Sequence, residues 1–310
     1  MPRFPDSDIA VIVPTNADPR RAELLRAAVG SVLTQDGAGA ELVVVINGGT
    51  ADAELVAWLN RQEGVRVIRR AEPNVSLARH AGLMATLSPY YCFLDDDDEL
   101  LPNALKLRCD ALAGHPEADV LVSDGLVRYP EGELPNFRDG MAAKIRRDPG
   151  LSFLERNWFD SPAATFRRSR IGPEYFSTNR RHYEWSHLLL RLISDTRCIE
   201  ILDQLTYLKR EDNPLSVSRS DEHLLQLPHF LIEALNLPLP PALRAGLQHK
   251  LVRAWNACAV HQLGAGQRRE AVKAHWQCLR AGGWSYLGFT RHLLWRVARS
   301  HTGSSPRQEK

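Results

Sequence analysis

The sequence predicts an α/β fold: a doubly wound, mostly parallel sheet flanked by helices, followed by a helical C-terminal extension. Short apolar runs rich in β-branched residues alternate with segments whose apolar residues recur at helical spacing. Strands buried on both faces of a parallel sheet read as continuous apolar runs of this kind. After residue 223 only helical patterns remain. The chain has 310 residues, 44% of them hydrophobic, which is enough for a sizeable core.

Each expected strand is a short apolar run bounded by turn or breaker residues. These runs cover residues 9–13, 42–46, 65–68, 90–94, 119–122 and 198–202, with a further strand-like run at 207–210. The first run ends at Pro14, and the second ends at the turn sequence Asn47-Gly48-Gly49. We therefore expect both to be buried parallel strands.

The intervening segments are expected to form helices. They cover residues 19–35, 52–61, 77–87, 102–114 and 183–194. In the first, Leu24, Leu25, Ala28 and Val32 recur at helical spacing, and in the fourth Pro102 suits a first helical turn. Residues 130–149 are polar and rich in turn residues, so they are expected to form a long loop.

The C-terminal part reads as a helical hairpin and a third helix, ending in a polar tail at residues 302–310. Residues 244–262 and 267–280 form the hairpin, with Trp255 and Trp276 expected in its core. In the third helix, within residues 284–300, one face carries Phe289, Leu293 and Val297, while Arg291, Arg296 and Arg299 lie elsewhere. Such a basic amphipathic helix is typical of contact with an anionic membrane. Docking onto the rest of the chain is the alternative.

Charge and cysteine content exclude several classes of protein to which the chain could belong. Thirty-nine Lys and Arg face 37 Asp and Glu, a net charge of +2 that is too balanced for a sequence-independent grip on a nucleic acid polymer. The five cysteines are widely spaced and form no metal or redox pair, as expected of reduced thiols in the cytoplasm. The sequence shows no signal-peptide pattern and no apolar stretch near the ~20 residues that cross a bilayer. We expect a cytoplasmic protein, peripheral at the inner face of the membrane if its acceptor is a lipid.

Three polar features follow strand ends and should therefore converge. They are Pro14-Thr15, Asn47 and the acidic run Asp95-Asp96-Asp97-Asp98. Ligands of open α/β sheets bind beyond the carboxyl ends of the strands. Neighbouring carboxylates repel one another, and a divalent cation is the simplest compensator. Mg²⁺ and Mn²⁺ prefer such oxygen ligands. The alternative is a solvated acidic loop that also caps the next helix.

A series of motifs, in order and at plausible spacing, resembles the family 2 glycosyltransferases of the GT-A fold. The motifs are Ile12-Val13-Pro14-Thr15, Ser31-Val32-Leu33-Thr34-Gln35, Val45-Ile46-Asn47-Gly48-Gly49-Thr50, Ala78-Arg79-His80-Ala81-Gly82, Phe93-Leu94-Asp95-Asp96-Asp97-Asp98 and Tyr183-Glu184-Trp185. The resemblance covers about residues 9–218. The chain departs from the family pattern at Ile46, Asn47, His80 and Glu184.

The resemblance implies an inverting transferase that takes its sugar from a nucleotide-diphosphate donor. By this match Glu184 is the catalytic base, Asp97 is the metal ligand for Mn²⁺ or Mg²⁺, and the donor is held by Pro14, Thr15, Asn47, Arg79, Asp95 and Asp96. The donor would be a UDP-sugar, with dTDP- and GDP-sugars as alternatives. The acceptor would be a glycan or glycolipid of a surface polysaccharide or lipopolysaccharide.

The same match divides the chain into a catalytic domain and an extension. Residues 1–222 would form the catalytic domain, with a nucleotide-sugar part over about 1–125 and an acceptor part over about 126–222. Residues 223–310 would form the helical extension. The sequence does not indicate an oligomeric state.

Other interpretations stay open at this stage. Asn47-Gly48 is also a common turn pair, Arg79 a plausible helix-surface residue and Glu184 an ordinary first-turn acid. If Glu184 is structural, Asp124 and Asp160 are the next carboxylates to consider as base. A nucleotidyltransferase is a second class, although a Gly-rich basic loop would usually follow its first strand, where Pro14-Thr15-Asn16 stands here. A non-catalytic nucleotide-sugar or carbohydrate-binding protein is a third.

Overall fold

The computed structural model describes residues 7–177, 180, 182–212 and 220–298. The chain divides into two compact units, Met1–Ser216 and Val217–Lys310. The end of the family resemblance, near residues 216–218, and the polar tail lie outside the described residues.

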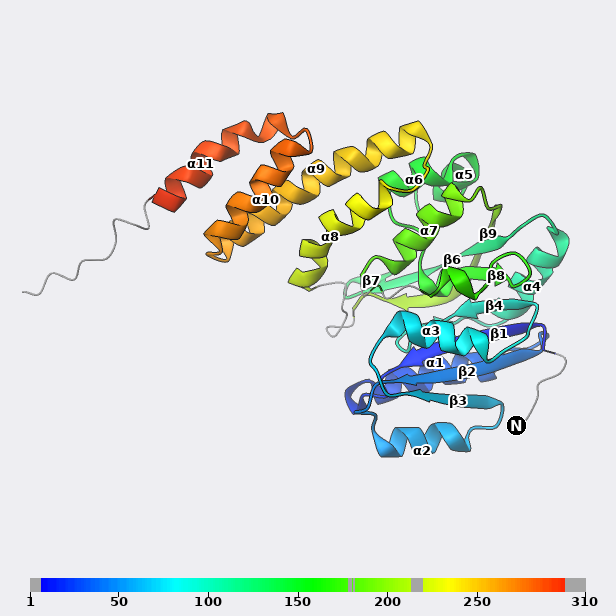
Figure 1. The fold of residues 1–310 in the computed structure, drawn as a ribbon. Coiled ribbons are helices and arrows are strands. Elements are labelled where there is room, and N and C mark those ends of the chain that lie inside the picture. Colours follow the sequence, from blue (N-terminus) through cyan, green and yellow to red (C-terminus); the bar gives the residue numbers. More distant parts are fainter. Residues whose placement is uncertain (1–6, 178–179, 181, 213–219, 299–310) are drawn as a thin grey trace, which may run out of the picture. The chain divides into compact units, whose positions relative to one another are not determined.

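The first unit is built on a nine-stranded sheet with the order β3-β2-β1-β4-β8-β6-β9-β5, with β7 paired to β6 (Figure 1). Its strands are β1 Ile9–Thr15, β2 Ala40–Asn47, β3 Val65–Arg70, β4 Tyr90–Phe93, β5 Glu99–Leu100, β6 Val120–Tyr129, β7 Gly132–Pro135, β8 Ala164–Arg167 and β9 Ile199–Arg210. Strands β1 to β4 are parallel, and so are β6 and β9. Strand β8 runs antiparallel between β4 and β6. The predicted α/β class, with its mostly parallel sheet, is confirmed.

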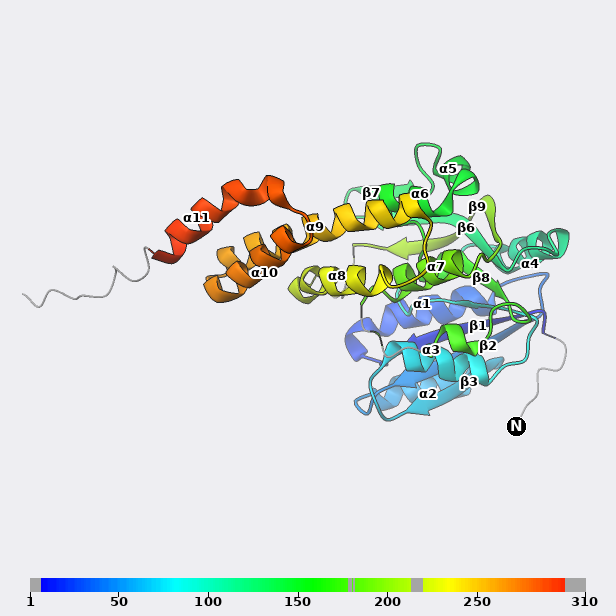
Figure 2. The ribbon, with the colours of Figure 1, turned by 45° about the horizontal axis from the view of Figure 1, so that its top comes forward.

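Along the chain, the helices of this unit alternate with its strands. They are α1 Ala22–Leu33, α2 Ala53–Arg61, α3 Val75–Met84, α4 Ala104–Gly114, α5 Met141–Arg147, α6 Pro149–Glu155 and α7 Glu184–Ser194. Helix α3 begins earlier than its apolar pattern suggested, because the Asn74 side chain accepts a hydrogen bond from the Leu77 amide and caps it. Figure 2 shows the same arrangement from a second direction.

Gly82 brings α3 close to the sheet. A Cβ added there would collide with Ile12 of β1 and lie 3.0 Å from Val45 of β2. A larger residue would push the helix away. Since Gly82 lies one turn after Arg79, this close packing fixes where the Arg79 side chain points.

An aromatic cluster supports the end of β4. Tyr91 stacks on Phe166 with ring centroids 5.1 Å apart, and Phe93 contacts Phe176 at 4.9 Å and Trp185 at 5.8 Å. Phe93 is the last residue of β4, two positions before Asp95, while Trp185 belongs to the first turn of α7. The cluster therefore holds the acidic run against the start of α7.

Two further sequence expectations for this unit differ from the structure. Residues 130–149 are not a continuous loop, because β7 and α5 form there and Met141, Ala142 and Ile145 are buried at helical spacing. This short apolar stripe is diluted by Lys and Arg in the sequence. The runs at 198–202 and 207–210 belong to one strand, β9, whose register against β6 shifts at Ser123 and Asp124.

The second unit contains α8 Asp221–Ala234, α9 Pro241–Gly264, α10 Arg268–Arg280, a 3₁₀ turn Trp284–Tyr286 and α11 Leu287–Ala298. Helices α9 and α10 form the predicted hairpin, in which Cys258, Ala259 and Ala274 are buried and Trp255 packs against them. The expectation that Trp276 lies in this core is wrong: it is 60% exposed, on the side of α10 away from Ala274. None of the helices among the described residues is long and apolar enough to cross a membrane.

Candidate functional site

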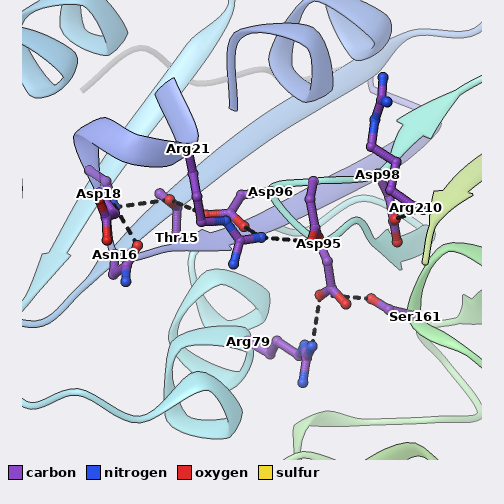
Figure 3. A network of polar contacts seen from close by, with 12 residues as sticks. Thr15, Asn16, Asp18, Arg21, Arg79, Asp95, Asp96, Asp98, Ser161 and Arg210 are labelled. Carbon is purple, nitrogen blue, oxygen red and sulfur yellow. Dashed lines mark hydrogen bonds and ion pairs between the residues drawn. The ribbon is translucent and has the colours of Figure 1, made fainter. Parts of the chain in front are cut away.

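Three residues that are distant in the sequence meet beyond the carboxyl end of β4. The guanidinium of Arg79 donates to Asp95 (Nη2 to Oδ1, 2.8 Å) and to Glu184 (Nη1 to Oε1, 3.1 Å). Figure 3 shows Arg79 reaching up from α3 to Asp95. Arg79 therefore contacts both the other predicted donor residue, Asp95, and the predicted base, Glu184.

Arg79 is buried, with 5% of its surface exposed, and the two carboxylates that it contacts balance its positive charge. Burial alone disfavours the charged form, but Asp95 and Glu184 outweigh it and raise the pKa of Arg79. The guanidinium also lies over the Trp185 ring, 5.1 Å from its centroid. Its Nε–H is buried and has no hydrogen-bond acceptor among the described residues.

Glu184 is the first residue of α7. The preceding Tyr183 adopts a left-handed backbone conformation (φ 59°), and its side chain makes no capping hydrogen bond. A carboxylate in the first turn is favoured by the helix dipole, so Glu184 helps to stabilise this end. Its contact with Arg79 directs the carboxylate toward Asp95.

Ser161 is a site residue that the sequence motifs did not single out. It precedes β8 and its Oγ donates to the Asp95 Oδ1 (3.2 Å), as Figure 3 shows. In the sequence, Ser161 is marked only by its place next to Asp160, an alternative candidate for the catalytic base.

Arg21 is a second such residue. Its Nη2 forms ion pairs with the Asp96 Oδ1 (2.5 Å) and the Asp97 Oδ2 (2.9 Å). Thr15 donates to the other oxygen of Asp96 (Oγ1 to Oδ2, 2.6 Å). The sequence feature that could have identified Arg21 is its position at the start of the first helix, directly beyond the carboxyl end of β1.

Asp96 and Asp97 thus share Arg21, whereas Asp95 contacts Arg79 and Ser161, as Figure 3 shows for Asp95. Burial raises the pKa of Asp96 to about 6, although Arg21 and Thr15 oppose this. Burial, together with Asp95 and Asp97, raises the pKa of Asp98 well above its usual value. Asp98 faces away from the others and accepts from the Arg210 amide (3.0 Å). The unfavourable proximity of like charges is therefore real, and Arg21 compensates part of it.

The expected metal ligand, Asp97, has a side chain that is 16% exposed. Among the described residues, no group of three or more His, Cys, Asp or Glu side chains is arranged to hold a metal ion. Sites for Mg²⁺ often use one or two carboxylates and take the remaining ligands from phosphates and water. Asp97 and Asp95 are carboxylates of the type that such sites use, and Arg21 occupies Asp97 in this structure.

Two of the expected donor residues have structural contacts. The Asn47 Oδ1 accepts from the Asn74 amide (2.7 Å), so Asn47 connects the end of β2 to the cap of α3. Pro14 is buried in β1 opposite Val45, where it positions the following Thr15.

The two alternative carboxylates are engaged elsewhere. The Asp124 Oδ1 accepts from the amides of Gly125 and Phe137, each at 2.8 Å, and burial raises its pKa. Asp160 forms an ion pair with Lys209 (3.0 Å). Asp124 therefore holds a loop, whereas Asp160 lies next to Ser161 and nearer the site.

A small pocket opens beside the contact of Arg79 with Glu184. It is lined by Ser76, Arg79, Tyr175, Phe176, Glu184, Trp185 and Leu188. A ligand group in this pocket would contact the guanidinium and the carboxylate at once.

A family model described as "Glycosyl transferase family 2" matches residues 10–192. No curated protein matches the sequence.

Several solved structures share the fold at low sequence identity. A crystal structure of residues 1–349 of TarS from S. aureus has a TM-score of 0.55 and 17% identity, covering 88% of this chain and 80% of that one. The same region in complex with UDP-GlcNAc gives 0.56 and 17%, covering 88% and 79%. In complex with UDP it gives 0.54 and 16%, covering 98% and 94%.

Proposed function

Because the chain belongs to glycosyl transferase family 2, as its motifs indicated, we propose that it moves a sugar from a nucleotide-diphosphate sugar to a hydroxyl of a glycan or glycolipid. The observation that carries this proposal is the double contact of Arg79 with Asp95 and Glu184. It joins a carboxylate proposed to seat the donor to one proposed to activate the acceptor. The pathway we propose is surface polysaccharide or lipopolysaccharide synthesis at the inner face of the membrane.

The proposed donor is a UDP-sugar. TarS, a protein of the same fold, has been crystallised with UDP-GlcNAc and with UDP, which supports a uridine nucleotide. Arg79 would contact the diphosphate, since a guanidinium can pair with two phosphate oxygens. Its buried Nε–H lacks an acceptor among the residues that the structure describes, and a buried donor without a partner is costly. A donor oxygen at this place would remove that cost.

The proposed reaction is a single displacement. Glu184 accepts the proton of the acceptor hydroxyl, whose oxygen forms a bond to the anomeric carbon. The bond from that carbon to the diphosphate oxygen breaks, and the nucleoside diphosphate leaves with the electron pair. Attack opposite to the leaving group inverts the anomeric centre. A general base of this kind contributes typically about 10²–10⁴-fold to the rate.

We also propose that the donor binds with Mn²⁺ or Mg²⁺, held by Asp97 with Asp95 nearby. Such an ion would neutralise charge on the departing diphosphate. Other residues of the chain position the carboxylates. Thr15 orients Asp96 and Ser161 orients Asp95, while Arg21 compensates the negative charge of Asp96 and Asp97. Asn47 would contact the base with the part of its amide that does not bind Asn74.

A thermal-shift panel of nucleotide-diphosphate sugars, with and without Mn²⁺, tests donor and metal together. A ligand that binds only the folded state raises the melting temperature. We expect the largest rise with a UDP-sugar and Mn²⁺ together, and its loss in Asp97→Asn. Asp110→Asn, in the exposed pair with Lys106 on α4, is the matched control and should respond like the wild type. A donor response that is unchanged in chelator would contradict the metal proposal.

A further inference from the structure

The exposed side of α10 combines apolar and basic residues. Val272 and Trp276 are exposed (39% and 60%), and Arg269, Lys273 and Arg280 share their side of the helix. On a helix, positions three and four apart lie on one face. The opposite face carries the buried Ala271, Ala274, His275 and Cys278. We name the exposed set Arg269, Val272, Lys273, Trp276 and Arg280 the α10 face.

Apolar exposure continues past the end of this helix. Trp284, in the 3₁₀ turn, is 65% exposed and Leu287, at the start of α11, is 50% exposed. By contrast, some of the apolar residues of α11 that were expected to contact a membrane pack within the unit itself. Leu293 is buried with Leu263 and Ala271, and Phe289 packs against the same cluster. The side chain of Val297 lies outside the described residues.

The charge of the chain is divided unevenly along its length. Residues 241–310 contain 12 Lys and Arg but only two Asp and Glu, a formal charge of +10. Residues 1–240 contain 27 Lys and Arg and 35 Asp and Glu, a formal charge of −8. The nearly neutral total of +2 therefore hides a strongly basic C-terminal part.

Two of the three basic residues of the α10 face remain available to a partner. Lys273 pairs with Glu270 on the same helix (2.7 Å). In the part of the chain that the structure describes, neither Arg269 nor Arg280 forms an ion pair. Glu270 is also the only acidic residue between positions 241 and 308.

We propose that the α10 face binds the surface of an anionic phospholipid bilayer. Tryptophan suits the membrane–water interface because its ring is apolar and its N–H is polar. Arginine and lysine beside it attract anionic headgroups. Val272 and Leu287 add apolar surface that a lipid can bury and a phosphate backbone cannot use, which favours a bilayer over a nucleic acid. Binding would bring the transferase to a lipid-linked acceptor, but it does not depend on transfer.

Sedimentation of the full chain with vesicles tests this directly. The vesicles are pure phosphatidylcholine, or phosphatidylcholine mixed with phosphatidylglycerol, each at low and high salt, without donor or acceptor. We expect binding only to the anionic vesicles and weakening at high salt, because the Debye length falls from about 10 Å at 0.1 M to about 3 Å at 1 M. Failure here would leave the proposed sugar transfer untouched, and the reverse also holds.

Two variants assign the binding to the α10 face. Each basic residue near an anionic surface contributes roughly fivefold to partitioning, so Arg269→Glu with Arg280→Glu should weaken binding by about 25-fold or more. Arg61→Glu with Arg147→Glu changes the net charge equally in the first unit, at exposed positions, and should weaken it much less. Trp276→Ala should also reduce binding, including at high salt.

Three results would overturn the proposal. The first is equal binding, or none, to neutral and anionic vesicles. The second is equal loss in the two charge-reversed variants. The third is a different occupant: retention on heparin, or self-association in light scattering, that is lost in the α10 variants while vesicles are not bound.

Discussion

Arg79 and Glu184 are 105 residues apart in the chain, and their side chains meet at 3.1 Å. The same guanidinium contacts Asp95 at 2.8 Å. A guanidinium presents five N–H donors in a fixed fork, which allows it to hold two carboxylates together. Through Arg79, helix α3 therefore connects the acidic run after β4 to the start of α7. This contact fixes the position of Asp95, proposed to seat the donor, relative to Glu184, the proposed base.

Replacing the proposed base should separate turnover from donor binding. Glu184→Gln keeps the size and one acceptor oxygen but cannot take a proton. We expect turnover to fall by about 10²–10⁴-fold while donor affinity, measured by calorimetry, stays within a few-fold. Near-normal turnover with a lower melting temperature would mean that Glu184 only stabilises α7, and Asp160 would then be the next carboxylate to replace.

Arg79 should matter for stability as well as for the donor. Arg79→Met leaves two partly exposed carboxylates without their partner, so it should lower the free energy of unfolding by about 1.5–3 kcal/mol. Arg79→Lys keeps the charge but not the fork, and should be less damaging. Arg170→Met is the control, since Arg170 is 56% exposed and lies 3.8 Å from Asp119; its loss should cost below about 1 kcal/mol. Equal losses in urea unfolding for Arg79→Met and Arg170→Met would contradict the bridging role.

Arg21 should compete with a divalent cation. Without its charge, Asp96 and Asp97 repel each other, and we expect Arg21→Met to lower stability by about 1–3 kcal/mol in chelator. Added Mn²⁺ should restore more stability to this variant than to the wild type. The measurement is the change in melting temperature on titration with MnCl₂. Arg20→Met is the control, because Arg20 is 71% exposed and pairs only with Asp18 among the described residues. The same Mn²⁺ response in all three proteins would show that Arg21 does not occupy the cation position.

Asn47 should be needed for the position of α3. Its Oδ1 accepts the Asn74 amide hydrogen bond, so Asn47→Ala should lower the free energy of unfolding by about 1 kcal/mol. Asn47→Asp keeps an acceptor and should preserve stability, which chemical denaturation can measure. If both variants are as stable as the wild type, the hydrogen bond contributes nothing and Asn47 is left only with its proposed contact to the nucleotide base.

The sequence was sufficient for the α/β class and for most strands, because buried parallel strands appear as continuous apolar runs and Gly and Pro mark their ends. It also singled out Arg79, Asp95 and Glu184 as candidates, since each stands in a motif of the family. It could not show that these three touch. That contact depends on Gly82, which lets α3 approach the sheet, and on the aromatic packing of Phe93 with Trp185.

Residues outside the motifs were missed for a physical reason. Arg21 and Ser161 act through long-range contacts, 75 and 66 positions from Asp96 and Asp95, and local spacing carries no record of such contacts. Trp276 was misplaced because a helical pattern shows which residues share a face but not which face is covered. Burial of the small residues Ala271 and Ala274 decided that face.

The release of UDP from UDP-sugars tests the central claim most directly, with wild type and Glu184→Gln measured side by side, with and without Mn²⁺ and a candidate acceptor extract. We predict that the wild type releases UDP in the presence of Mn²⁺, that an acceptor speeds this release, and that Glu184→Gln slows it by about 10²–10⁴-fold while still binding the donor. If no nucleotide-diphosphate sugar is bound or turned over by the wild type, the chain is not a working transferase of this kind. If Glu184→Gln releases UDP at the wild-type rate, the proposed mechanism is wrong.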